Sequence, residues 1–105
     1  MSQDVFIVRM NWTDTAVLER LFLTRAAVVA DIVLCEIPAN EITAILQCNP
    51  EEHICDDVTE TIARAVANEG ERLGECSPEA RDFIEEFAGL AWARGLRVVE
   101  KAFAA

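Results

Sequence analysis

The beginning of the chain holds a short segment that is almost entirely apolar. Residues 5–10, VFIVRM, are mostly β-branched or aromatic. Such a run predicts either a short edge strand or an extended arm that packs on helices. Thr13, Asp14 and Thr15 follow it, and all three are residue types that cap helix N-termini. We therefore expect a helix to begin directly after the arm.

Residues 15–36 fit a helical pattern that is apolar around most of its circumference. At about 100° per residue, Arg20, Thr24 and Asp31 share one narrow stripe, and aliphatic and aromatic side chains fill most of the remainder. A helix of this kind is typical of the buried centre of a bundle. Pro38 ends the pattern, because the residue before a proline is disfavoured in the α region.

Two further helical patterns follow the proline. Residues 39–47 carry three inward aliphatic side chains at helical spacing. The sequence Asn-Pro-Glu-Glu at 49–52 then combines a capping residue, a proline at the first helical position and acids in the first turn. The helix that begins there is expected to reach Leu73, either unbroken or with an interruption near residues 56–57.

The end of the chain predicts one more helix. Gly74 is a natural helix stop, and Ser-Pro-Glu at 77–79 is a second strong start, leading into a helix over residues 78–98. The whole pattern predicts a single domain over residues 1–105 with an all-α fold, a small bundle of four to five helices with an extended N-terminal arm. An α+β fold with a short N-terminal strand is the alternative.

One stretch resembles a known DNA-binding motif. Residues 42–66, ITAILQCNPEEHICDDVTETIARAV, resemble the bacterial helix–turn–helix, with an Asn-Pro turn and an apolar residue, Ile54, four positions after the proline. The resemblance implies a second helix placed in the major groove. However, Gln47 stands where such turns often have glycine, and five carboxylates precede the first basic residue, Arg64. Reading helices need cationic or amide side chains, so we expect an ordinary hairpin or a motif turned to another partner, without DNA binding.

Composition narrows the function classes. The 105 residues carry a net charge of −10 with a pI near 4.4, and 52% of them are hydrophobic, with a mean hydropathy of +0.19. The charge argues against nucleic acid or an anionic membrane as a direct partner. The chain has one histidine and no tyrosine, which limits acid–base catalysis, so we expect no enzyme. No signal peptide or membrane span is evident, and the expected location is the cytoplasm.

The cysteines raise the question of a metal. In a cytoplasmic protein, Cys35, Cys48, Cys55 and Cys76 are expected to be reduced thiols. Cys48, His53 and Cys55 are the candidate metal ligands, because thiolate and imidazole suit zinc. Their spacing is irregular, and on a helix begun at residue 50 His53 and Cys55 point about 200° apart. We therefore expect no metal, no cofactor and no catalytic residue.

The distribution of charge is the strongest functional signal. Residues 1–50 have a net charge of −3, residues 51–86 hold twelve acidic and three basic residues, and residues 87–105 have a net charge of +2. The acidic segment is either a solvated face or an anionic surface for a basic protein. The expected partner-binding residues are Glu52, Asp56, Asp57, Glu60, Glu71, Asp82, Glu85 and Glu86.

These features predict a non-enzymatic protein that binds a basic protein surface. Carboxylates three or four residues apart on a helix lie about 5–6 Å apart, and such a row can imitate nucleic acid. The most concrete form is a phage or mobile-element inhibitor, of the anti-CRISPR or anti-restriction type, that engages a nucleic-acid-binding defence complex. The alternatives are a dimeric host regulatory or adaptor protein with a helix–turn–helix-like hairpin and a Cys/His metal or thiol sensor.

The apolar content also predicts self-association. More apolar surface is present than one small core is expected to bury. We expect a homodimer that uses the 15–36 segment and the stretch containing Phe83, Phe87, Leu90 and Trp92.

Overall fold

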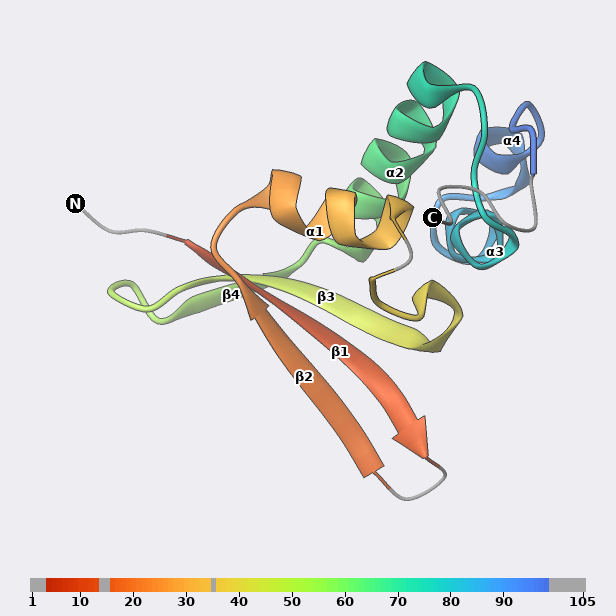
Figure 1. The fold of residues 1–105 in the computed structure, drawn as a ribbon. Helices are drawn as coiled ribbons and strands as arrows, with labels where there is room; N and C mark the ends of the chain where they lie inside the picture. Colours follow the sequence, from red (N-terminus) through yellow and green to blue (C-terminus); the bar gives the residue numbers. More distant parts are fainter. Residues whose placement is uncertain (1–3, 14–15, 35, 99–105) are drawn as a thin grey trace.

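The computed structural model describes residues 4–13, 16–34 and 36–98 and shows an α+β fold (Figure 1). Four antiparallel strands form one sheet in the spatial order β2-β1-β3-β4. In chain order the elements are β1 (Val5–Thr13), β2 (Ala16–Phe22), α1 (Arg25–Val33), the 3-10 helix η1 (Ala39–Glu41), β3 (Ile42–Asn49), β4 (Ile54–Asp57), α2 (Thr59–Leu73), α3 (Pro78–Phe87) and α4 (Leu90–Ala93). The expected all-α bundle with an extended arm is therefore wrong.

β1 is a central strand of the sheet and not an arm or an edge. It pairs with β2 on one side and with β3 on the other. Because successive side chains of a strand point to opposite faces, Phe6, Val8 and Met10 share one face, and all three are buried. This face of the sheet meets the helices.

The expected long helix over residues 15–36 is instead a strand followed by a shorter helix. Residues 16–22 pair with β1 over their whole length, with Phe22 opposite Phe6 and Leu18 opposite Met10. The large apolar residues of this segment stand in two adjacent pairs separated by Glu19 and Arg20, which is a helical spacing, and the pairing with β1 overrides it. Thr24 then caps α1, its hydroxyl accepting a hydrogen bond from the Ala27 amide at 3.1 Å.

The expected helix over residues 39–47 is also wrong. Only η1 is helical, and the remainder belongs to β3. A register shift lies where Arg9 pairs with Ala44 and Met10 pairs with Ile42. The extra residue of this β-bulge places Ile42 and Ile45 on the same buried face. A three-residue spacing that is typical of a helix therefore arises here from a bulged strand.

The Asn-Pro-Glu-Glu start makes its capping bonds without starting a helix. Asn49 Oδ1 accepts from the amides of Glu51 and Glu52, both at 3.1 Å. The chain then reverses through His53, which has a positive φ of 56°, and returns as β4. The first helix–turn–helix element is thus a strand and the second begins with one, which removes the structural basis of that resemblance.

The helix boundaries later in the chain agree better with the sequence. α2 ends at Leu73 and Gly74 follows in the left-handed conformation, as expected of a C-terminal glycine. α3 begins at Pro78, where the Ser77 hydroxyl accepts from the Ala80 amide. It ends at Phe87, however, and α4 is a separate short helix instead of its continuation to residue 98.

The helices lie over one face of the sheet and enclose the core there (Figure 1). α1 and α2 pack on each other and on the strands, and α3 packs on α2 and η1. The fully buried centre joins these layers through Val8 and Ile45 from the sheet, Ile32 from α1, Ile62 from α2 and Phe83 from α3.

Candidate interaction surfaces

The expected acidic residues are divided between two ends of the molecule. Glu52 and Asp56 belong to the β3–β4 hairpin end, whereas Asp82, Glu85 and Glu86 lie on α3. Figure 1 shows the hairpin turn and α3 on opposite sides of the fold, whose longest extent is 40 Å. The 51–86 segment therefore forms two acidic surfaces instead of one.

The outer face of α3 is the more regular of the two. Phe83 and Ile84 bury the inner face of this helix, and Glu79, Asp82 and Glu86 follow one another at three- and four-residue spacing on the exposed side. Glu85 is held by Arg81 at 3.1 Å. No ion pair to the other three is present among the residues that the structure describes.

We call the row of Glu79, Asp82 and Glu86 the α3 stripe. Glu79 belongs to it, although it is not among the partner-binding residues expected from the sequence. Its position in the first turn after Ser77-Pro78 explains it as a helix-start acid. The same residue is also three positions before Asp82 and seven before Glu86. This three- and four-residue spacing was the signal in the sequence that Glu79 shares a helix face with Asp82 and Glu86.

The hairpin end forms a small polar hollow of about 240 Å³, lined by Asp4, Gln47, Asn49, Glu52, Ile54 and Asp56. Asp4 is held there by two amides, because Oδ2 accepts from Gln47 Nε2 at 2.6 Å and Oδ1 accepts from Asn49 Nδ2 at 3.0 Å. Glu52 and Asp56 are exposed at its rim. This end is acidic, but its amides already engage one carboxylate.

Asp57 has a structural position at the start of α2. Its Oδ1 accepts from the Thr59 amide at 2.9 Å and from the Thr59 hydroxyl at 2.6 Å. These bonds, the side-chain one first, hold the pKa of Asp57 below the ordinary value for an aspartate. The buried Thr59 hydroxyl also accepts from the Ile45 amide at 2.9 Å, so this contact ties α2 to β3.

Glu60 and Glu71, the remaining expected residues, lie on α2. Glu60 forms an ion pair with Arg64, whose guanidinium lies 5.7 Å from the centre of the Trp92 ring. Glu71 borders a hollow of about 220 Å³ against the α4 region. Both residues lie on a different helix and therefore do not extend the α3 stripe.

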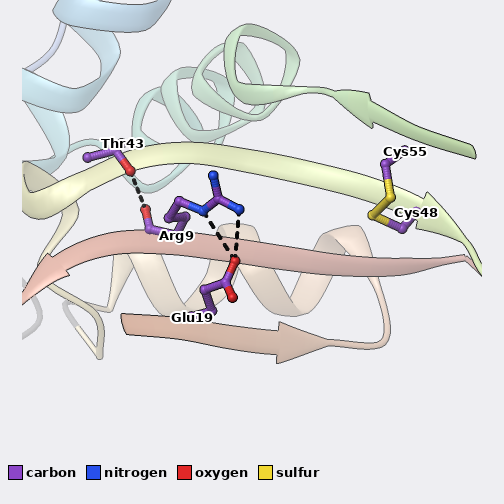
Figure 2. A network of polar contacts seen from close by, with 5 residues as sticks. All are labelled: Arg9, Glu19, Thr43, Cys48 and Cys55. Atoms are coloured by element: carbon purple, nitrogen blue, oxygen red, sulfur yellow. Dashed lines mark hydrogen bonds and ion pairs between the residues drawn. A yellow bond between two sulfur atoms is a disulfide. The ribbon is translucent and has the colours of Figure 1, made fainter. Parts of the chain in front are cut away.

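The cysteines differ from the expectation of reduced thiols. Cys48 and Cys55 are opposite each other on β3 and β4 and form a disulfide, with their Cα atoms 4.0 Å apart (Figure 2). Disulfide sulfurs cannot be thiolate ligands, so the candidate metal set with His53 loses two of its members. Cys76 is buried, and Cys35 lies outside the described residues. Within those residues, no group of three or more His, Cys, Asp or Glu side chains is arranged to hold a metal.

An open apolar groove lies between α1 and α2, with a volume of about 690 Å³. Its lining is mainly alanine, valine and leucine, with Arg25 and Arg72 among the few charged members. The hydrogen bond from Arg72 lowers the pKa of Glu69 in the same groove. The expected dimer surface is only partly exposed: Phe83 is buried, whereas Leu90 and Trp92 are accessible.

Comparison of the chain with protein-family models, curated proteins and solved structures finds no match. Within the described ranges, none of the helices has both the length and the apolar character needed to cross a membrane. The function is therefore inferred from the geometry of the surfaces above.

Proposed function

We propose that this protein is a non-enzymatic binding protein that presents the outer face of α3 to a basic surface of a partner protein. The observation that supports the proposal is the α3 stripe of Glu79, Asp82 and Glu86, three carboxylates in line on an exposed helix face without ion pairs in the described structure. Uncompensated like charges repel one another along a helix. A cationic partner relieves that repulsion.

The rigidity of α3 favours this surface over the hairpin end. Ser77 caps the helix, and Phe83 and Ile84 anchor it in the core. A fixed row of charges loses little conformational freedom on binding, which favours affinity. A basic groove that normally binds the phosphates of a nucleic acid has the matching chemistry. The most specific form of the proposal remains an inhibitor of a nucleic-acid-binding defence complex, of the kind encoded by phages and mobile elements.

The test compares two variants with the same change in charge. In the first, Glu79→Gln, Asp82→Asn and Glu86→Gln neutralise the α3 stripe. In the second, Glu51→Gln, Glu52→Gln and Asp56→Asn neutralise the hairpin end. Each is immobilised beside the wild type, and retention of basic nucleic-acid-binding proteins from a host lysate is measured with and without competing DNA.

We expect the wild type and the hairpin variant to retain the same basic protein, and the α3 variant to lose it. Competing DNA should displace that protein, and added salt should weaken its retention. Equal retention by all three proteins contradicts the proposal. Equal loss from both variants shows that net charge, and not the α3 stripe, is responsible. Circular dichroism confirms that each variant is folded.

A further inference from the structure

The first half of β1, residues 5–8, is apolar on both of its faces, although helices cover only one of them, and Arg9 and Asn11 continue the uncovered face as polar residues. Phe6, Val8 and Met10 are buried beneath the helices, whereas Val5 and Ile7 alternate onto the opposite side of the sheet. An antiparallel sheet with one solvated face normally carries polar residues there. A strand that is apolar on both faces is instead typical of burial on both. The second face of this strand therefore has the composition of a contact surface.

Neighbouring strands extend this apolar surface across the sheet. The register places Leu21 of β2 and Leu46 of β3 on either side of Ile7, in one row. Leu21 is 64% exposed, the largest exposed fraction among the large hydrophobic residues that the structure describes. In the next row, Val5 lies beside the Cys48–Cys55 disulfide. We call the rows formed by β1, β2 and β3 on this side the open sheet face.

The charged groups of the open sheet face neutralise each other. Arg9 donates from Nε and Nη2 to Glu19 Oε2, at 3.2 and 3.1 Å, across the β1–β2 pair. Figure 2 shows this pair near the middle of the strands and the disulfide near the end of β3. Asp57 borders the Leu46 row from β4 and stays ionised, because its hydrogen bonds from Thr59 lower its pKa. The rows of β1, β2 and β3 that form the open sheet face thus carry no net charge, on a chain of net charge −10.

We propose that the open sheet face is the interface of a homodimer in which the sheets of two copies pack face to face. The charge pattern identifies the second copy as the occupant. A basic partner is attracted to the acidic ends of the molecule and gains no electrostatic attraction from a face without net charge. A second copy of this acidic chain is repelled by the rest of the surface, so this face is where it can bind. Under two-fold symmetry each Arg9–Glu19 pair meets another pair of both signs, so the surface is self-complementary.

The size of the open sheet face sets the strength of the contact. Three strands about 4.8 Å apart, each about 17 Å long over the paired residues, give a surface of about 250 Å². Stable interfaces bury roughly 800 Å² per partner, and the open sheet face alone supplies less than half of that area. Loops and the hairpin ends add to the interface only where they also come into contact. The dimer is therefore concentration-dependent, with the sheets about 10 Å apart as in other face-to-face packings.

The experiment measures mass by light scattering and by sedimentation, from micromolar to submillimolar protein. We expect the mass to rise from the 11.6 kDa of one chain towards twice that value. Leu21→Glu should shift the transition to at least tenfold higher concentration, because it introduces a carboxylate beside Ile7 into the apolar row of both faces. Leu90→Glu is the matched control: Leu90 is 47% exposed on α4, and its replacement makes the same change in charge.

A charge exchange supplies a second, independent readout. Arg9→Glu alone should weaken the dimer, because it places two carboxylates together on each face. Arg9→Glu combined with Glu19→Arg should restore it, because the pair is again neutral. A wild type that stays monomeric at submillimolar concentration overturns the proposal. So does a dimer that Leu90→Glu disrupts and Leu21→Glu does not, since that result places the interface on the helices.

The dimer and the proposed function fail separately. Neutralising the α3 stripe should leave the mass unchanged, because α3 lies on the helical side of the fold (Figure 1). Leu21→Glu should leave retention of a single basic partner intact. Each variant therefore tests one surface.

Discussion

The two faces of the sheet contain similar side chains in different surroundings. On the covered face, Val8 and Ile45 are opposite each other and are completely buried by the helices. One residue away on the same strands, Ile7 and Leu46 form the corresponding pair on the open sheet face and are only half-buried. Hydrophobicity along a strand therefore does not show which face forms the core. The helices decide that, because they cover one face and leave the other open.

The largest expected difference between the faces comes from introducing a charge. Val8→Asp buries an unpaired carboxylate among Ile45 and the helices, and we expect it to lower the free energy of unfolding by more than about 4 kcal/mol, enough to unfold a marginal domain. Ile7→Asp places the same group on the open sheet face and should cost less than about 1.5 kcal/mol. Urea unfolding followed by circular dichroism, at low protein concentration, compares them. Similar losses would mean that the two faces are equally buried.

A second comparison uses adjacent residues of β2. Phe22 is buried opposite Phe6, whereas Leu21 is exposed. We expect Phe22→Ala to lower the free energy of unfolding by about 3 kcal/mol, through lost burial and the cavity it leaves. Leu21→Ala should change it by less than about 0.5 kcal/mol. The same unfolding measurement decides, and a large loss for Leu21→Ala would show that the monomer already covers this side chain.

The disulfide tests how far the end of the open sheet face depends on a covalent link. Cys48 and Cys55 are seven residues apart, and a loop of that length contributes about 2.5 kcal/mol in the chain-entropy model. Replacing both cysteines with serine should lower the free energy of unfolding by about that amount or less. Reducing agent should lower the stability of the wild type similarly and leave the double variant unchanged. A reducing agent that also destabilises the double variant would point to Cys76 or Cys35.

The smallest expected effect concerns Asp57 and its pH dependence. Asp57→Ala removes the bonds to Thr59 and should cost about 1 kcal/mol at neutral pH, as for a lost helix cap. Because the folded-state pKa is lowered, the stabilisation is present above the unfolded-state pKa and is lost as the pH falls through the folded value. The variant and the wild type should therefore converge as the pH falls below the ordinary aspartate range and through the lowered folded-state pKa.

Asp56→Ala is the control for this measurement, because the adjacent carboxylate forms no described bond to Thr59. It should leave the unfolding free energy almost unchanged at either pH. A difference between Asp57→Ala and the wild type that persists in acid would assign the loss to packing and not to the ionised carboxylate.

Two local signals in the sequence predicted helix ends correctly. Gly74 and the Ser77-Pro78 pair act through their own backbone and nearest neighbours, and both behave as expected. Asn49 also makes its predicted capping bonds, yet only a turn forms. A cap satisfies the first amides of a helix but does not decide whether the following residues continue it. The Cys48–Cys55 pairing and the β3 ladder require the chain to return, and that contact is not local.

The hydrophobic pattern did not reveal β2 and β3, because pairing with other strands decides their conformation. The bulge beside Arg9 gives Ile42 and Ile45 a helical spacing, and the helical spacing of the apolar residues in β2 is overridden by its pairing with β1. For the candidate surfaces, Asp82, Glu85 and Glu86 of α3 were expected on an exposed helix face because helix spacing is local, whereas Glu79 was not among them. Their separation from Glu52 and Asp56 depends on the turn at His53 and was not predictable from spacing alone.

The edges of the sheet determine whether assembly continues after two copies meet. β4 has four residues, ends in Asp56 and Asp57, and offers a short, charged edge, while the β2 edge carries Glu19 and Arg20. Such edges resist the addition of further strands. A face-to-face pair consumes the single open face of each copy, so the contact has no free end from which a filament can propagate. Self-association in this protein should therefore terminate at the pair and not lead to fibres.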